Sequence, residues 1–194
     1  MAVPSPSPSK SDLRAEGLRL RREFARSLTP GLRTELEAAL ARLVLPHLAG
    51  ARVVALYHPL KDEISPMAIL AGLGGGQSHA LPWFAHRDAR FLWREGPATE
   101  PSPWGVLQAA ASAEALAPDV VLVPIVLADR HCTRIGHGKG HYDRALAHLR
   151  ASGAPVFTIG LAWESQISDA PIPADPWDMK LDAVATPKEW IQCG

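Results

Sequence analysis

The apolar residues near the start of the chain recur at helical spacing. Steps of three and four residues separate Leu13, Gly17, Leu20, Phe24 and Leu28. This pattern predicts an amphipathic helix that Pro30 stops. Leucines at positions 32, 36, 40 and 43 repeat the pattern and predict a second helix before Pro46.

Beyond these helices, most apolar segments have the length and composition of strands. The predicted strands are Arg52–His58, His79–Trp83, Arg90–Arg94, Val120–Leu127, Pro155–Trp163 and Leu181–Ala185. Further helices are predicted at Pro66–Leu73, Ala109–Leu116 and His141–Arg150. Because Val120–Leu127 is β-branched and apolar on both faces, we expect it at the centre of a sheet. Helices that alternate with such strands predict a three-layer α/β sandwich.

A single domain accommodates this pattern. The length of 194 residues fits one domain, and the sequence contains no internal repeat and no interdomain linker. Residues 1–9 alternate Pro and Ser and lack the apolar core of a signal peptide, so we expect a flexible tail. Residues 10–194 are expected to form the domain.

Composition and charge argue against several classes of protein, including nucleic-acid-binding and membrane-spanning proteins. Lys plus Arg number 20, as do Asp plus Glu, and this balance argues against a nucleic-acid or membrane-surface role. The longest apolar run, Val120–Ala128, has nine residues including a proline, which is too short to span a bilayer. Cys132 and Cys193 give neither a disulfide framework nor zinc spacing. We therefore expect a cytoplasmic protein in a reducing compartment, with no membrane or nucleic-acid partner.

One face of the first predicted helix is basic and has two interpretations. It carries Lys10, Arg14, Arg19, Arg21, Arg22 and Arg26. Acidic residues at 12, 16 and 23 partly neutralise these charges. The face is therefore either simply solvated or a source of positive charge for a site.

A glycine-rich loop carries the most informative chemistry. In Arg134–Arg144, glycines at 136, 138 and 140 alternate with other residues just before a predicted helix. Alternating glycines let successive backbone N–H groups approach an anion, and a helix N-terminus adds partial positive charge. Arg134 and Lys139 supply full positive charges, and Asp143 in the first helical turn could hold a divalent cation. The loop therefore has the groups that a polyphosphate needs.

Plainer interpretations remain open for each of these residues. The three glycines can form a tight strand-to-helix turn, and Asp143 can be only a helix-start carboxylate. The spacing matches neither the dinucleotide fingerprint nor the phosphate-loop motif. Glu63 follows a strand end, where α/β proteins place ligands, although a loop glutamate is usually solvated. Asp178 lies in an apolar segment and can be a turn or cap residue.

The segment Asp119–Leu146 resembles the signature of the 5-formyltetrahydrofolate cyclo-ligase family, also called methenyltetrahydrofolate synthetases. The matching residues are Val123, Pro124, Asp129, Arg130, Arg134, Gly136, Gly138, Gly140, Tyr142 and Asp143. Further segments match in the same order: Lys10–Arg14, His58–Glu63, Leu161–Gln166 and Trp177–Asp182. The resemblance therefore covers nearly the whole chain.

The resemblance implies a mixed, mainly parallel sheet in an α/β/α sandwich and an ATP- and Mg²⁺-dependent enzyme, expected to be a monomer. Such an enzyme converts 5-formyltetrahydrofolate into 5,10-methenyltetrahydrofolate through a phosphorylated formyl intermediate and releases ADP and phosphate. The implied ATP-binding residues are Lys10, Arg14, Arg134, Gly136, His137, Gly138, Lys139, Gly140, His141 and Tyr142. The implied catalytic residues are Lys139 and Arg134, the Mg²⁺ ligands Asp143 and Asp178, and the folate-binding residues His58, Glu63 and Tyr142.

The sequence also departs from the family pattern. The usual Phe before the Asp-Arg pair is Ala128, the first aromatic of the loop's pair is His141, and a Glu-Pro element is Gln108-Ala109. These departures motivate one rival, a folate- or nucleotide-binding protein without turnover. A second rival is a phosphosugar isomerase-like enzyme, because similar sandwiches bind sugar phosphates and fold alone does not decide function.

Overall fold

The computed structural model describes residues 8–193, so most of the predicted tail lies outside the described residues. The helices are α1 (Lys10–Ser27), α2 (Pro30–Leu48), α3 (Met67–Ala71) and α4 (His141–Ala151), with one 3₁₀ turn, η1 (Glu164–Gln166). The main sheet contains β1 (Val53–Ala55), β2 (Ser78–Trp83), β3 (Leu92–Glu95), β6 (Val120–Pro124), β9 (Phe157–Leu161), β11 (Ala183–Ala185) and β12 (Trp190–Gln192). Shorter strands are β4 (Glu100–Pro101), β5 (Leu107–Gln108), β7 (Leu127–Asp129), β8 (Arg134–Ile135) and β10 (Ile167–Ser168).

The main sheet is mixed and mostly parallel. Its strand order is β12-β11-β9-β6-β1-β2-β3. Neighbours from β11 to β2 pair in parallel, whereas the two outer strands, β12 and β3, pair antiparallel. Since β6 is in the middle of this order, the prediction that its segment forms a central strand is confirmed.

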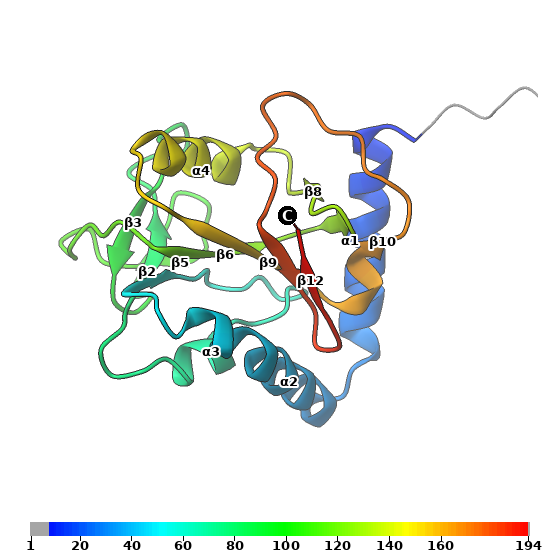
Figure 1. Ribbon diagram of the computed structural model, residues 1–194, viewed down its shortest axis with the longest axis horizontal. Helices are drawn as coiled ribbons and strands as arrows, with labels where there is room; N and C mark the ends of the chain where they lie inside the picture. Colours follow the sequence, from blue (N-terminus) through cyan, green and yellow to red (C-terminus); the bar gives the residue numbers. More distant parts are fainter. Residues whose placement is uncertain (1–7, 194) are drawn as a thin grey trace, which may run out of the picture.

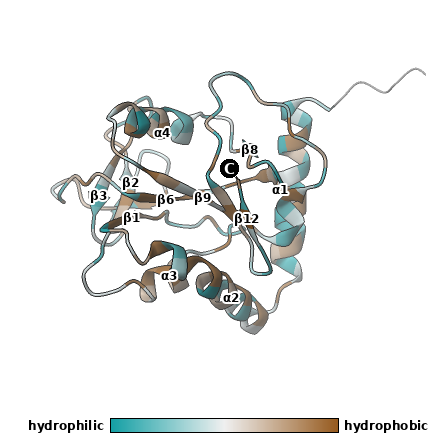
Figure 2. Cartoon of the chain, viewed as in Figure 1, coloured by the Kyte–Doolittle hydropathy of each residue, from teal (hydrophilic) through white to brown (hydrophobic). Residues whose placement is uncertain are grey.

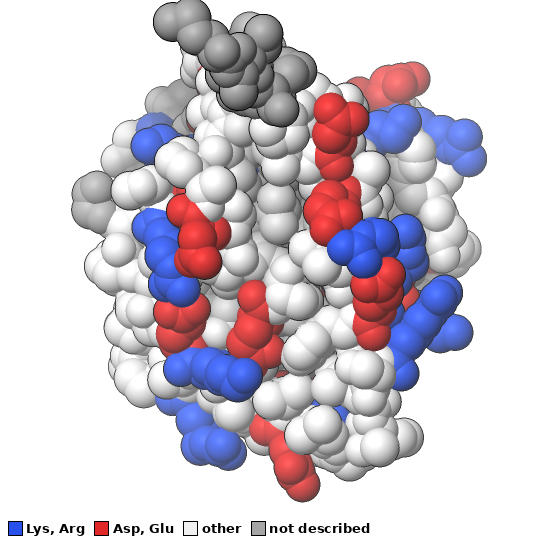
Figure 3. Space-filling view, turned by 90° about the vertical axis from the view of Figure 1, so that its right-hand side faces the viewer, with Lys and Arg blue, Asp and Glu red and all other residues white. Residues whose placement is uncertain are grey.

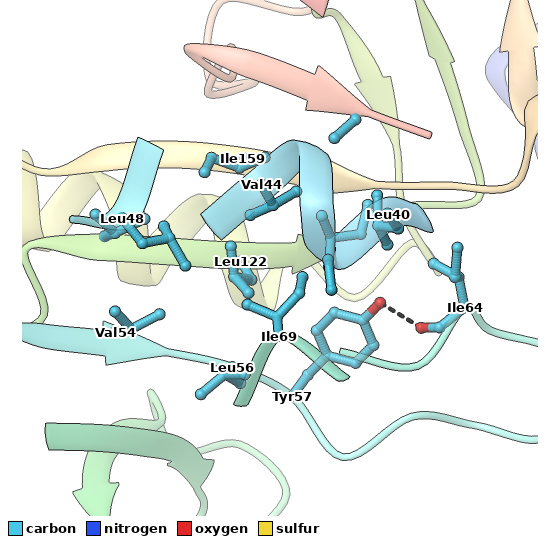
Figure 4. Packing of buried hydrophobic residues seen from close by; sticks show 14 of the residues in the cluster. Leu40, Val44, Leu48, Val54, Leu56, Tyr57, Ile64, Ile69, Leu122 and Ile159 are labelled. Carbon is cyan, nitrogen blue, oxygen red and sulfur yellow. Dashed lines mark hydrogen bonds between the residues drawn. The ribbon is translucent and has the colours of Figure 1, made fainter. Parts of the chain in front are cut away.

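Helices cover both faces of the sheet, which gives the expected three layers (Figure 1). On the α2 and α3 side, Leu40, Val44 and Leu48 pack in one buried cluster with residues of β1, β6 and β9 (Figure 4). In the same cluster, the hydroxyl of Tyr57 donates a 2.7 Å hydrogen bond to the carbonyl of Ile64, so this buried phenol is satisfied.

The opposite face of the sheet packs against α4. Ala145 and Leu146 of α4 are buried together with Val121 and Val123 of β6. Figure 2 shows β6 and β9 as mainly apolar strands between the helices. Burial on both faces explains why the β6 sequence has no polar alternation.

The first helix, α1, begins and docks through specific contacts. Ser9 caps it in a capping box with Asp12. Gly17 packs so closely on β7 that a Cβ there would lie 2.8 Å from the carbonyl oxygen of Val126. Figure 3 shows a face on which acidic and basic groups alternate. On α1 itself, Arg19 pairs with Glu16 and Glu23 at 2.5 and 2.6 Å.

Some element predictions were wrong or incomplete. The predicted helix Ala109–Leu116 is instead turn and extended chain, because its backbone hydrogen-bonds to β3: the Leu116 N–H donates to Trp93. The predicted strand Val120–Leu127 ends at Pro124, and the following β7 joins a separate three-stranded sheet. The second helix continues through Pro46 to Leu48, and the final strand β12 was not predicted.

The cysteine prediction also needs correction. Cys132 and Cys193 are bonded through their sulfur atoms, with Cα atoms 6.0 Å apart, and no cysteine in the described chain is free. Spacing alone could not show this, because 61 residues separate the two and only the fold brings them together. The sequence argument for a reducing compartment therefore loses its premise.

Candidate active site

One cavity of about 830 Å³ opens where β1, β2 and β6 end. Parallel α/β sheets bind ligands at this carboxyl edge of their strands. All fourteen predicted site residues line the cavity: Lys10, Arg14, His58, Glu63, Arg134, Gly136, His137, Gly138, Lys139, Gly140, His141, Tyr142, Asp143 and Asp178. The fold thus gathers four separate sequence segments around one space.

The glycine loop joins β8 to α4 along one wall of the cavity. Gly138 and Gly140 have φ angles of +88° and +63°, in the left-handed region that favours glycine. A Cβ at Gly138 would also lie 3.2 Å from the guanidinium carbon of Arg14. Gly140 is the N-cap of α4 and offers no side-chain cap, so the N–H groups of the first turn remain available to an anion.

The basic face of α1 is divided between solvent and the cavity. Lys10, Arg14 and Arg21 are separated by four and seven residues, which places them on one stripe of the helix. Arg14 Nε donates a 2.9 Å hydrogen bond to the carbonyl of Gly136. Lys10 and Arg14 line the cavity and Arg21 is buried, so the interpretation of the whole face as solvated is wrong.

Lys10 ties α1 to the segment before β11. Its ammonium pairs with Asp175 at 2.6 Å and with Asp178 at shorter range. Partial burial lowers the pKa of Lys10, but the hydrogen bonds to the two carboxylates outweigh this and raise it above its ordinary value. Partial burial raises the pKa of Asp178, and the Lys10 ammonium reverses this to a net lowering.

Arg134 and Asp143 form a second ion pair in the wall. Arg134 NH2 lies 2.6 Å from Asp143 Oδ1, and Arg134 NH1 also donates to the carbonyl of Met179. The Arg134 side chain is only 5% exposed. Burial lowers the pKa of Arg134 below its ordinary value, although Asp143 acts in the opposite direction. Arg134 therefore holds Asp143 and the Met179 segment in place.

Asp143 and Asp178 are the carboxylates of the cavity wall that could hold a Mg²⁺ ion together with a phosphate ligand. Within residues 8–193, Asp143 Oδ2 and Asp178 Oδ1 accept no hydrogen bond, so each side chain keeps an oxygen available. The described part of the chain contains no group of three or more His, Cys, Asp or Glu side chains arranged for a metal. One or two carboxylates together with substrate phosphates is the usual way in which proteins bind Mg²⁺.

Lys139 and His141 lie beside an aromatic wall. The Lys139 ammonium lies 5.5 Å from the ring centre of Trp104, and the His141 ring packs edge-on against Trp104 and Phe84. Burial, followed by the nearby charges of Arg144 and Lys139, lowers the pKa of His141. This shift favours the neutral ring, and because a guanidinium can only donate, His141 Nδ1 accepts from Arg144 over 3.0 Å.

Glu63 is a buried carboxylate rather than a solvated loop residue. It is 4% exposed, and its Oε2 accepts a 2.9 Å hydrogen bond from the N–H of Leu60. Its Oε1 lies 3.2 Å from Arg21 NH1 and 3.4 Å from His137 Nε2. His58 also lines the cavity.

Tyr142 lines the cavity as a neutral phenol. Burial, with a smaller contribution from Glu63, raises its pKa well above the ordinary value. The same two causes raise the pKa of Tyr57 beside it.

Several cavity residues were not predicted. They include Tyr57, Phe84, Phe91, Arg144, Asp175 and Trp177. Asp175 precedes Asp178 by three residues in a non-helical turn, where the Asp175 N–H donates to Asp178 Oδ2. The aromatic residues come from segments with no shared spacing, so only the fold reveals them.

The departures from the family pattern have clear structural positions. Ala128 is fully buried in the core and does not line the cavity. Gln108 is 5% exposed and lines the cavity, where its amide accepts from Phe84 N at 2.9 Å and donates to Phe84 O at 3.3 Å. A glutamate could not donate the second bond, so Gln108 suits this backbone contact.

Comparisons with known proteins show the family to which this chain belongs. A sequence profile described as the 5-formyltetrahydrofolate cyclo-ligase family matches residues 6–187. A protein of that name from Mycolicibacterium smegmatis is 31% identical, over 94% of this chain and 96% of its own. The mouse protein of that name is 26% identical, over 95% and 96%.

Solved structures share the fold. The NMR structure of the Aquifex aeolicus 5,10-methenyltetrahydrofolate synthetase has a TM-score of 0.75 and 25% identity, and covers 94% of this chain and 92% of that one. A Mycoplasma pneumoniae 5,10-methenyltetrahydrofolate synthetase has a TM-score of 0.69 and 22% identity, over 93% and 99%. Among the helices described here, none is long and apolar enough to cross a membrane.

Proposed function

Because this chain belongs to the 5-formyltetrahydrofolate cyclo-ligase family, we propose that it converts 5-formyltetrahydrofolate into 5,10-methenyltetrahydrofolate at the expense of ATP. The formyl oxygen attacks the γ-phosphorus of ATP, and the bond to the β-phosphate oxygen breaks, which releases ADP. N10 then attacks the formyl carbon and loses its proton to the departing phosphate. The phosphate leaves with the former formyl oxygen, and the ring closes.

The phosphoryl transfer needs positioning and positive charge more than a covalent group from the protein. In our proposal, the N–H groups of Gly136, Gly138 and Gly140 bind the phosphates of ATP. Lys139 neutralises the transferring phosphoryl group, and Lys10 and Arg14 contribute charge from α1. His137, His141 and Tyr142 complete the nucleotide side of the cavity.

We propose that Asp143 and Asp178 hold Mg²⁺, which supplies charge neutralisation to the phosphates when bound. Arg134 keeps Asp143 in position through their ion pair, at 2.6 Å. The Lys10 ammonium forms an ion pair with Asp178. In our proposal it turns toward the phosphates when the nucleotide binds.

On the other side of the cavity, we propose that Glu63 accepts hydrogen bonds from the amino and ring N–H groups of the pterin, with His58 and Tyr142 beside it. A carboxylate would contribute substantially to pterin affinity, because hydrogen bonds to charged groups are worth about 1.5–3 kcal/mol each. A monomeric state and a cytoplasmic location are further predictions of the same proposal.

The observation that carries the proposal is the meeting of two unlike sites in one cavity. A glycine loop with cations lines one side, and the buried carboxylate of Glu63 lines the other. A phosphosugar isomerase would need the glycine loop and its cations to bind the sugar phosphate. It would not need a second binding site large enough for a pterin. The binding-only alternative loses part of its motivation, because Ala128 lies away from the cavity and the Gln108 amide makes two hydrogen bonds to the backbone of Phe84.

The test is the growth of methenyltetrahydrofolate absorbance from 5-formyltetrahydrofolate, with and without ATP, and with Mg²⁺ removed by a chelator. We expect absorbance to rise only with ATP and Mg²⁺, with one ADP formed per product. Product without ATP would contradict the proposed reaction. Protection by ATP against thermal unfolding without ADP formation would support the binding-only alternative.

A further inference from the structure

Three polar side chains from three separate segments meet at the cavity wall, where Glu63 and His137 line the cavity and Arg21 does not. Arg21 comes from α1, Glu63 from the chain after β1, and His137 from the glycine loop. Arg21 NH1 lies 3.2 Å from Glu63 Oε1 and 3.4 Å from His137 Nε2, and these last two atoms are also 3.4 Å apart. The three atoms therefore form a closed triangle.

The pair formed by Arg21 and Glu63 is almost completely buried. Arg21 is 3% exposed and Glu63 is 4% exposed. Within residues 8–193, Glu63 is the only carboxylate that pairs with Arg21, and the Nε of Arg21 is buried without any hydrogen-bond partner. Breaking such a pair is costly, because the remaining charge stays in the interior uncompensated.

The carboxylate of Glu63 is held from two directions. The N–H of Leu60 binds Oε2 from within the same turn, and Arg21 lies against Oε1. Arg21 does not line the cavity, whereas Glu63 does. A ligand in the cavity therefore meets Glu63, while Arg21 stands behind it.

We propose that Arg21 is a positioning residue for the folate-binding carboxylate. It directs the carboxylate of Glu63 toward the cavity, where that carboxylate is available to the N–H donors of the pterin. The inference rests on the proposed function, because it assumes that Glu63 binds the substrate. Arg21 itself touches neither substrate.

The first test is direct binding of 5-formyltetrahydrofolate, measured by calorimetry without ATP. We expect Arg21→Met to raise the Kd for 5-formyltetrahydrofolate by about 10- to 100-fold, the range expected for hydrogen bonds to a charged group. The Kd for ATP, measured separately, should change by less than about twofold, because His137 is the only one of the proposed ATP-binding residues within 8–193 that contacts Arg21 or Glu63.

Arg22→Met is the matched control, because Arg22 is the next residue of α1 and is exposed. It should leave both dissociation constants unchanged. Arg21→Lys keeps the positive charge and should recover most of the affinity for 5-formyltetrahydrofolate. Arg21→Gln keeps hydrogen-bonding ability without charge and should not recover it. If Arg21→Met does not fold, the comparison of the Arg21→Lys and Arg21→Gln affinities still tests the proposal.

A double-mutant cycle separates positioning from general stability. In a Glu63→Gln background, Arg21→Met should cost little further affinity, because the carboxylate that Arg21 positions is already absent. Equal cost in both backgrounds, equal affinity of the Lys and Gln variants, or unchanged affinity in Arg21→Met would overturn the inference. Failure of the wild-type protein to bind 5-formyltetrahydrofolate at all would instead contradict the proposed function.

Discussion

At the residue scale, the glycine loop exposes one cation to the cavity. Lys139 lies between two glycines whose backbone is left-handed, so its side chain is set by the loop rather than by a helix or strand. In the free protein its ammonium lies over the ring of Trp104 at 5.5 Å. A cation–π contact of this kind at an exposed site is worth about 0.5–1 kcal/mol, which phosphate can readily displace.

Lys139→Ala should therefore reduce turnover steeply while folate binding is nearly unchanged. A preorganised cation at a transferring phosphoryl group is worth about 3–4 kcal/mol, or about 10²–10³ in rate. Steady-state turnover at saturating ATP measures this. Lys188→Ala, at a lysine that is 74% exposed between β11 and β12, is the control and should keep wild-type turnover. Near wild-type turnover in Lys139→Ala would show that Lys139 is a solvent-facing residue with no role in phosphoryl transfer.

Glu63→Gln should weaken the binding of 5-formyltetrahydrofolate by about 10- to 100-fold, because a neutral amide loses the charged hydrogen bonds to the pterin. ATP affinity should be nearly unchanged. Asp62→Asn is a matched neighbour that does not line the cavity and should leave both affinities as they are. Separate titrations with 5-formyltetrahydrofolate and with ATP measure the two affinities. An equal loss of affinity for both ligands would contradict the assignment of Glu63 to folate binding.

At the element scale, α1 combines a packing role with a role at the site. Its Gly17 packs directly on the backbone of Val126, the residue before β7, and its Lys10 reaches Asp175 and Asp178. The helix can bring its cations to the cavity only if it docks this closely. Stability and site assembly are therefore linked through this one helix.

Gly17→Ala should lower the thermal unfolding midpoint, because the new Cβ would lie 2.8 Å from the carbonyl oxygen of Val126. Overpacking of this kind costs about 1–3 kcal/mol, which exceeds the gain of about 1 kcal/mol from better helix propensity. Gly31→Ala in α2 is the control, since nothing lies within 4 Å of its added Cβ, and it should raise the midpoint. Equal shifts in the two variants would contradict the close packing of α1.

The link between Lys10 and Asp178 should give a defined pH dependence. The lowered pKa of Asp178 adds stability that is complete above its ordinary value of 3.8 and disappears as the pH falls through the lowered pKa. The raised pKa of Lys10 adds stability that is complete below 10.5 and disappears as the pH rises through the raised pKa. The difference in unfolding midpoint between wild type and Lys10→Met should thus be constant between these values. A difference that varied across neutral pH would contradict this.

At the scale of the whole molecule, sequence patterns predicted the sheet and the loop residues that line the cavity. They did not predict the contacts between segments that are far apart in the chain. The central strand and α4 were found because burial on two faces and helix-start chemistry are local signals. The Ala109–Leu116 prediction failed because pairing with β3 overrode the helix propensity of its alanines. The role of Arg21 was hidden for a similar reason: its partner Glu63 is 42 residues away, and nothing local marks the pair.

The bond between Cys132 and Cys193 is another property of the whole fold. It ties the end of the chain, after β12, to the turn between β7 and β8, two residues before Arg134. The bond closes a loop with a sequence separation of 61 residues. Closing a loop of this length restricts the unfolded chain by about 4 kcal/mol in the chain-entropy description.

Reduction should therefore lower the thermal unfolding midpoint of the oxidised wild-type protein by roughly 10 °C. Cys193→Ala should unfold at the lower temperature whether or not reductant is present, because it has no bond to lose. Thiol alkylation followed by mass spectrometry reports the state of the wild-type protein directly. Two alkylated thiols in unfolded protein that had never been reduced would show that the bond does not form in solution. An unchanged midpoint on confirmed reduction would show that the bond adds nothing to stability.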